Sequence, residues 1–137
     1  MKTLPQSCEQ CLEIYSKALD DLELYAARAR KLDTSEANRE LIINFEITHE
    51  LALKLMGKYF EKMGKGPFSG SRDLTVEAFH AELIHDGKAW LDIVIDRIKY
   101  NPIYEMDSQH DLVNRVLKIY IPMLEKFEDT MSKKLDE

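Results

Sequence analysis

The strongest constraint on this chain is a seven-residue repeat of apolar side chains over residues 4–32. Its two rows are Cys8, Tyr15, Leu22 and Ala29, and Cys11, Ala18, Tyr25 and Leu32. An interval of seven keeps both rows on one side of an α-helix, which is typical of helices that pack lengthwise against a neighbour. The repeat therefore predicts one long bundle helix, for whose start Thr3 and Gln6 offer a capping box.

Further segments show apolar residues at helical spacing, separated by residues that break helices. A second helix is predicted from an N-cap within residues 33–35 to a stop at residue 64, and residues 64–71, GKGPFSGS, form the main breaker cluster and predict a flexible loop. A short helix is predicted to end near residues 86–87, and a fourth helix to stop at residues 101–102. The last helix is predicted to begin with a cap at Ser108 and to kink at Pro122.

The composition agrees with helices and excludes most β architectures. Five Gly and four Pro in 137 residues are few for an all-β chain, and no segment alternates apolar and polar residues. The predicted fold is all-α, an up-and-down four-helix bundle with one additional short helix. Length fits a single domain over residues 1–137, with a C-terminal tail at about residues 130–137.

Charge and hydropathy limit the classes of partner. The chain has 19 Lys and Arg against 25 Asp and Glu, a net charge of −6, which opposes broad binding to DNA or RNA. No uncharged stretch approaches the roughly 20 residues of a membrane span, and the start carries no signal-peptide run. We expect a soluble, cytoplasmic protein without membrane contact. Cys8 and Cys11 lie on the apolar rows, which indicates core packing.

A metal site is one reading of three Glu-x-x-His steps. They are Glu46 to His49, Glu77 to His80 and Glu82 to His85. A di-metal carboxylate bundle needs two such steps plus one inward Glu from each of the other two helices. The first and last helices show no such Glu, so we expect no metal and no cofactor, with the di-metal bundle as the lowest-ranked alternative.

The predicted end of the fourth helix gathers polar chemistry. Residues 96–104 carry an acid, two cations, two phenols and an amide around a proline. Helix ends and loops can hold polar groups near a core without burying them unpaired. An ordinary helix terminus, in which Arg97 and Lys99 favour the negative end of the helix dipole, explains the same composition. Composition alone does not separate these two interpretations.

An ordered set of short segments resembles a known family. The second helix reads FEITHELALK over residues 45–54, and later matching segments lie at residues 72–73, 77–79, 83–84, 86–87, 90–91 and 96–97. Together they resemble the nucleotidyltransferase substrate-binding branch of the HEPN helical family, over roughly residues 12–128. The resemblance implies a helical bundle, usually a homodimer, that works beside a separate minimal nucleotidyltransferase. Such pairs commonly form toxin–antitoxin modules in which the helical subunit is the toxin-like member.

The resemblance also implies a motif at the end of the fourth helix. In the active branch of the family an Arg, four residues, a His, one residue and a Tyr cleave RNA without metal across a dimer. Here Arg97 and Tyr104 occupy the Arg and Tyr positions, and Pro102 stands where the His is expected. Cleavage needs groups that take and give protons near neutral pH, and proline does neither.

We therefore expect a binding subunit with no assigned catalytic residue. Arg97 is the expected contact to an anion such as nucleotide or RNA, with Tyr100 and Asn101 as neighbours. Asp96 is expected to orient Arg97 or to cap local amides. The alternative is a metal-independent HEPN ribonuclease acting at a dimer interface, in which Arg97 is catalytic and His49 or His110 replaces the missing base.

Two further features complete the expected site. In related pairs the partner transfers AMP from ATP to the motif tyrosine, so the resemblance implies modification of Tyr104; a phenol packed over the bundle end is the alternative. Glu46, Glu50 and Lys54 are four residues apart and share one helix face. The order of Glu50 before Lys54 favours an ion pair, so this face is either a helix-stabilising row or a polar binding face.

Overall fold

The computed structural model describes residues 7–100 and 106–136, and all regular structure in these ranges is helical. The elements are α1 (Cys8–Leu32), α2 (Ser35–Lys62), α3 (Ser71–His80), α4 (Gly87–Lys99), α5 (Met106–Arg115), the π-helical turn η1 (Val116–Tyr120) and α6 (Ile121–Leu135). The predicted all-α helical bundle is confirmed. In the described part of the chain, no helix is both long and apolar enough to cross a lipid bilayer.

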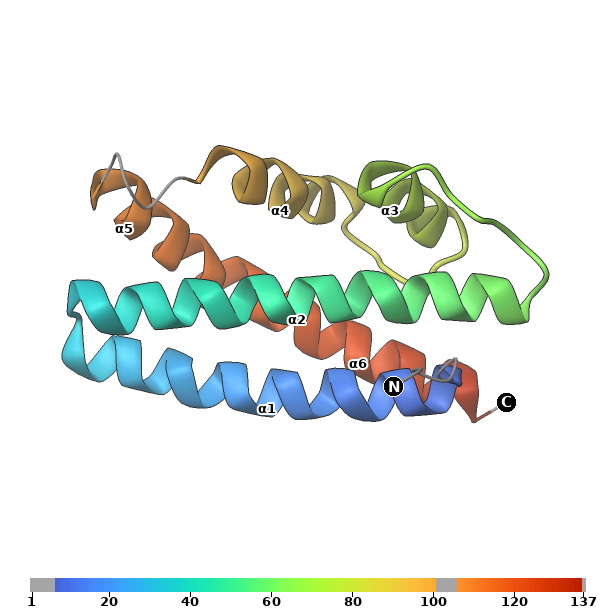
Figure 1. Ribbon diagram of the computed structural model, residues 1–137, viewed down its shortest axis with the longest axis horizontal. Helices are drawn as coiled ribbons and strands as arrows, with labels where there is room; N and C mark the ends of the chain where they lie inside the picture. The colour runs from blue at the N-terminus through green and yellow to red at the C-terminus, as the bar shows by residue number, and fades with distance from the viewer. Residues whose placement is uncertain (1–6, 101–105, 137) are drawn as a thin grey trace, which may run out of the picture.

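The helices form a bundle around α2. Figure 1 shows α1 and α2 side by side as an antiparallel hairpin, with α3 and α4 along the opposite side of α2 from α1. The continuous rod α5–η1–α6 crosses this arrangement diagonally, and α6 packs on α1 while α5 contacts α2. Helix α3 is the additional short helix, so α1, α2, α4 and the last rod are the four main members.

The start of α1 differs from the prediction. The helix begins at Cys8, and its N-cap is Ser7. The Ser7 hydroxyl accepts the amide N–H of Gln10 at 3.1 Å, and the Gln10 side chain accepts the amide N–H of Ser7 at 3.0 Å. The described helix therefore starts at a capping box four residues after the predicted one, and Thr3 and Gln6 themselves lie outside the described residues.

The buried face of α1 also drifts from a strict repeat of seven. The first row, Cys8, Tyr15, Leu22 and Ala29, is buried as predicted. In the second row Cys11 is buried as predicted, Ala18 and Tyr25 are only half-buried, and Leu32 is exposed. The buried residues next to Ala18 and Tyr25 are Leu19 and Ala26. A straight helix has 3.6 residues per turn and drifts by about 20° per seven residues from a strict repeat of seven, so positions next to a predicted row can enter the buried face.

Helix α2 begins as predicted, with the Thr34 hydroxyl accepting the amide N–H of Ala37 at 3.1 Å. Helix α3 ends at His80, earlier than predicted. Gly87 is the first residue of α4, and the Asp86 carboxylate caps that helix by accepting the amide N–H of Ala89 at 3.0 Å. The prediction that residues 86–87 end α3 is wrong, because Asp86 starts a helix.

The last rod contains a π-helical turn where a kink was predicted. The ring nitrogen of Pro122 has no hydrogen to donate to the preceding turn. Over Val116–Tyr120 the backbone widens, and the Ile121 amide donates to the Val116 carbonyl. Ser108 lies inside α5, so the predicted cap there is wrong. Residues 130–135 belong to α6, with Met131 fully buried, and so form helix instead of the expected tail.

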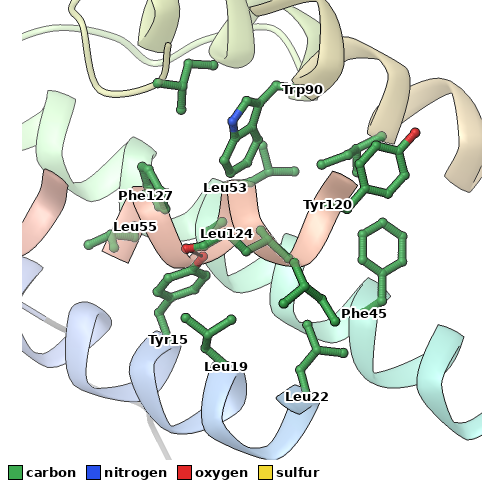
Figure 2. Close-up of a cluster of buried hydrophobic side chains, with 14 of the residues drawn as sticks. Tyr15, Leu19, Leu22, Phe45, Leu53, Leu55, Trp90, Tyr120, Leu124 and Phe127 are labelled. Carbon is green, nitrogen blue, oxygen red and sulfur yellow. Dashed lines mark hydrogen bonds between the residues drawn. The ribbon is translucent and has the colours of Figure 1, made fainter. Parts of the chain in front are cut away.

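Aromatic side chains occupy the centre of the core between α1, α2, α4 and α6 (Figure 2). The Phe127 ring makes edge contacts with Tyr15 at 5.5 Å and with Trp90 at 5.4 Å between centroids. Phe45 and Tyr120 stack at 5.5 Å. The buried Tyr15 hydroxyl donates to the Leu124 carbonyl at 2.7 Å, so the phenol is satisfied inside the core. This core fixes the position of α4 against α2.

Candidate functional site

Arg97 joins α4 to α2 at the centre of the candidate site. It follows Trp90, Ile93 and Val94 on the inward face of α4. Its Nη1 donates to Nδ1 of His49 at 2.9 Å and to a carboxylate oxygen of Glu50 at 2.8 Å. The Arg97 side chain is 26% exposed and that of Glu50 is 65% exposed. His49 therefore holds the guanidinium from inside the bundle, and Glu50 covers it on the solvent side.

His49 is a buried, neutral imidazole. It is 1% exposed and lies near the rings of Phe45 and Trp90, at centroid distances of 6.5 and 6.1 Å. Burial, followed by the positive charge of Arg97, lowers the pKa of His49 to about 3. Because arginine only donates, Nδ1 must be unprotonated and Nε2 carries the hydrogen. This Nε2–H has no acceptor among the described residues.

A small cavity of about 270 Å³ lies beside this pair. Its lining residues come from three helices: Glu46, His49, Glu50 and Leu53 of α2, Val94, Arg97 and Ile98 of α4, and Ser71 of α3. Burial raises the pKa of the Glu46 carboxyl, and the Arg97 charge offsets part of this effect. The cavity is thus lined by one guanidinium and by a buried neutral imidazole, and an incoming anion competes with Glu50 for Arg97.

The arrangement is suited to binding more than to proton transfer. A general base must accept a proton near neutral pH, and its ideal pKa lies near that pH. In His49, Nδ1 is occupied by Arg97, Nε2 already carries a proton, and the pKa is about 3. His110, the other residue considered as a replacement base, is an exposed residue of α5 and does not line the cavity.

Asp96 points to a different set of partners from the one expected. It accepts from Nε and Nη2 of Arg115 at 2.8 and 3.0 Å, and from the hydroxyl of Tyr120. Neither an Arg97 contact nor an amide cap is formed by its carboxylate among the described residues. Burial and, next, the hydrogen bond that Tyr120 donates to Asp96 raise the pKa of Tyr120 well above its usual value. The hydrogen bonds that Arg115 donates to Asp96 raise the pKa of Arg115. Asp96 therefore ties α4 to the last rod.

The remaining predicted site residues are placed as follows. Tyr100 is the half-buried C-cap of α4, and its buried hydroxyl has no partner within the described ranges. Lys54 is exposed and does not pair with Glu50, whose carboxylate is taken by Arg97. Asn101 and Tyr104 lie outside the described residues, as does Pro102. The structure thus joins Glu46 and Glu50 to Arg97 and leaves Lys54 apart.

The three Glu-x-x-His steps do not converge on a metal. Within residues 7–100 and 106–136, no three His, Cys, Asp or Glu side chains are grouped as metal ligands. His49 is bonded to Arg97, and His80 and His85 are exposed at the end of α3 and in the turn after it. The di-metal alternative therefore finds no ligand set in the described part of the chain.

Sequence reasoning missed the hydrogen-bond partners of both Arg97 and Asp96. His49 was considered as a metal ligand or a base, and Arg115 and Tyr120 were not considered as site residues. One signal could have identified His49, because it follows Phe45 by one helical turn on an apolar face and is therefore expected to be buried. A buried imidazole needs a polar partner, and arginine is a suitable one.

Comparison with known proteins identifies the family to which the chain belongs. The sequence profile of the family described as "Nucleotidyltransferase substrate binding protein like" matches residues 10–133, which is most of the chain. A search among curated proteins finds no match. The profile covers all of the helices that build the Arg97 cavity. The chain therefore belongs to the nucleotidyltransferase substrate-binding protein-like family.

Proposed function

We propose that this chain is the helical, substrate-binding subunit of a two-protein system whose other member is a separate minimal nucleotidyltransferase. The observation that carries the proposal is the family match over residues 10–133. In such a division, the transfer chemistry belongs to the partner and the helical subunit supplies contacts. The neutral, Nε2-protonated state of His49 supports this division, because the cavity offers hydrogen-bond donors without a neutral-pH base.

Arg97 is the proposed contact to an anionic group of the substrate. Its planar guanidinium suits two-point contact to phosphate. Glu50, which covers it, is 65% exposed, so its carboxylate can turn into solvent when a phosphate competes. His49 keeps Nη1 in place during this exchange. Tyr100 and Asn101, which follow Arg97 in the sequence, are proposed as neighbouring contacts.

Tyr104 is the proposed site of modification by the partner. In this step the phenol oxygen forms a bond to the α-phosphorus of ATP, pyrophosphate leaves with the electron pair of the broken P–O bond, and the phenol proton passes to solvent. The product carries AMP on Tyr104 and adds negative charge seven residues after Arg97 in the sequence. Added charge there would oppose binding of a second anion.

The assembly is proposed to contain two copies of this chain, and the pair with the nucleotidyltransferase to act as a toxin–antitoxin module. The family resemblance supports both statements. The exposed Ile95 and Ile98 on α4 also support a second copy, because they leave apolar surface uncovered beside Arg97.

Co-purification from the source cells tests the pairing. Tagged protein should recover a small nucleotidyltransferase at comparable amount, identified by mass spectrometry. The Arg97→Ala variant should recover the same partner, because Arg97 is proposed to contact substrate and not the partner. Recovery of the tagged chain alone would contradict the proposal.

A second experiment tests the modification. The recovered pair is incubated with ATP and magnesium, and the mass of the helical subunit is measured. We expect an added AMP on the peptide containing Tyr104 and no addition in Tyr104→Phe. An unmodified Tyr104 in an active pair would remove this part of the proposal.

A further inference from the structure

The cavity beside Arg97 continues into a larger groove along the second half of α2. The two share Glu50, Leu53 and Ser71 in their linings. The groove encloses about 1130 Å³ and the cavity about 270 Å³. Small-molecule pockets usually measure roughly 300–1,000 Å³. The cavity alone therefore holds only part of a ligand, and the groove provides the space for the rest.

One wall of the groove is apolar and aromatic. Leu53 and Leu74 line it from α2 and α3, and Phe68 lines it from the loop between them. The Phe68 ring lies edge-on to Phe60 at a centroid distance of 5.2 Å, which holds the loop against the end of α2. A half-buried aromatic ring beside aliphatic side chains suits a flat, apolar group.

The groove is also lined by positively charged lysines. Lys54, Lys58 and Lys65 line the groove, and Lys58 pairs with Glu61 at 3.7 Å. Lys54 and Lys65 form no ion pair with any described residue. Two uncompensated cations attract a compact anion, whereas a nucleic-acid strand needs a longer row of cations than this acidic chain presents.

Gly57 lines the same groove in the interior of α2. A glycine in a helix interior costs about 1 kcal/mol relative to alanine. Here the backbone has no positive φ that would require glycine, and a Cβ built at this position meets no atom within 4 Å. Neither strain nor crowding explains the residue, but the absent side chain leaves the groove deep.

Two side chains that line the cavity, His49 and Arg97, each have a hydrogen-bond donor that is unused within the described ranges. His49 Nε2–H and Arg97 Nε–H are buried without partners among the described residues. Ser71, which lines both spaces, is the first residue of α3, and no side chain caps that helix. The Arg97 side chain is 26% exposed, and a guanidinium beside an uncapped helix N-terminus suits the oxygens of a phosphate.

We infer that the cavity and the groove form one site for a free nucleoside phosphate, with its phosphates toward Arg97, His49 and Lys54 and its base against Phe68 and Leu74. This inference rests on the proposed substrate-binding function. It adds the α2 groove and the loop lysine Lys65 to the substrate site, and it names a mononucleotide as the substrate class.

Calorimetric titration of the full chain tests the ligand class. The probes are ATP, GTP, adenosine, inorganic triphosphate and a short single-stranded RNA. We expect ATP or GTP to bind more tightly than adenosine or triphosphate alone, because each of these fills only one part of the site. No binding of either nucleoside triphosphate, or tighter binding of the RNA, would overturn the inference.

Substitutions in the groove test its location. Gly57→Phe fills open space, so it should preserve the helix while weakening nucleotide binding by about tenfold or more, which corresponds to at least 1.4 kcal/mol. Gly57→Ala, which adds only one methyl group to the groove, should weaken binding less than Gly57→Phe does. The double change Lys54→Glu and Lys65→Glu should weaken nucleotide binding similarly. Lys31→Glu, in the last turn of α1 and outside the groove lining, should leave nucleotide binding unchanged. Equal affinity of Gly57→Phe and wild type, with helicity verified by circular dichroism, would place the ligand elsewhere.

Co-purification of the nucleotidyltransferase with Gly57→Phe separates this inference from the proposed function. Retained pairing with weakened nucleotide binding supports both. If the nucleotidyltransferase still co-purifies but the wild-type chain binds no nucleotide, the nucleotide site in the groove is rejected and the proposed function stands. Groove-dependent nucleotide binding without any nucleotidyltransferase partner rejects the proposed function alone.

Discussion

Arg97 and His49 are joined by a hydrogen bond of 2.9 Å between Nη1 and Nδ1, although 48 residues separate them in the sequence. The bond links α4 to α2 next to the core ring of Phe45. Because arginine cannot accept, protonation of His49 at Nδ1 breaks the bond and places two positive groups together. The α2–α4 contact is therefore coupled to pH through His49.

His49→Gln should reduce the loss of stability in acid. The pKa of His49 is about 3 in the folded chain, against an ordinary value of 6.5. As pH falls, His49 is therefore protonated in the unfolded chain before it is protonated in the folded chain. The contribution of neutral His49 to the free energy of unfolding is fully present above pH 6.5 and is lost as pH falls toward 3. Urea unfolding between pH 7 and pH 4 should show a steeper decline in the free energy of unfolding for wild type than for His49→Gln.

A matched control for this experiment is His85→Gln. His85 is exposed in the turn before α4, so its profile should run parallel to that of wild type. A His49→Gln profile that also runs parallel to wild type would show that the imidazole is not held neutral by its surroundings.

Asp96→Asn should loosen α4 from the last rod. The Asp96 carboxylate accepts two bonds from Arg115 and one from Tyr120, and hydrogen bonds to charged groups contribute about 1.5–3 kcal/mol. We expect a loss of this size in urea unfolding. Asp92→Asn, one turn earlier on α4, breaks only the exposed pair with Lys88 and should cost about 0.3–0.5 kcal/mol. Equal losses in the two variants would contradict the assigned role of Asp96.

Glu23→Gln should remove a pH effect of the opposite sign. The hydrogen bond with Glu125 on α6, with smaller effects of burial and neighbouring acids, raises the pKa of Glu23 to about 7. The folded chain thus holds a proton that the unfolded chain releases near pH 4.5, so this contribution is present at low pH and is lost as pH rises through 7.

The check is the melting temperature at pH 5 and at pH 8. The melting temperature of Glu23→Gln should exceed that of wild type at pH 8, and this difference should be smaller at pH 5. Glu13→Gln, an exposed change on the same helix, is the control. Because Glu23 and His49 act in opposite directions between pH 4.5 and 6.5, each is measured as a difference between variant and wild type. A gain for Glu23→Gln that is equal at both pH values would contradict the shared proton.

The sequence predicted the fold well because its main signals are local. The row of Tyr15 and Leu22 identified the buried face of α1, and the N-cap predicted within residues 33–35 identified the start of α2, where Thr34 is the cap. The structure differs from the prediction where two local signals compete. Ser7 and Thr3 each offer a capping box, and Asp86 before Gly87 reads equally as the end of one helix or the start of the next.

The site was predicted less completely because its contacts are not local. Arg97 was identified from the motif that the family resemblance implies at the end of the fourth helix, and Glu50 from its place on a polar face. Which groups meet depends on how α2 and α4 pack, and no spacing rule relates residues 48 positions apart. The choice of Arg115 as the partner of Asp96 likewise depends on the path of the last rod past its π-helical turn.

Two glycines should respond to alanine with opposite signs. Gly57 is a helical residue whose added Cβ meets nothing within 4 Å, so Gly57→Ala should raise the free energy of unfolding by about 1 kcal/mol through helix propensity. At Gly87 the added Cβ would lie 2.9 Å from the Phe79 ring, so Gly87→Ala forces that ring to move and should lower stability by about 1–3 kcal/mol. Urea unfolding of both variants at pH 7 checks the pair. A destabilised Gly57→Ala would mean that the groove is closed at Gly57, and with it the case for a ligand there would fail.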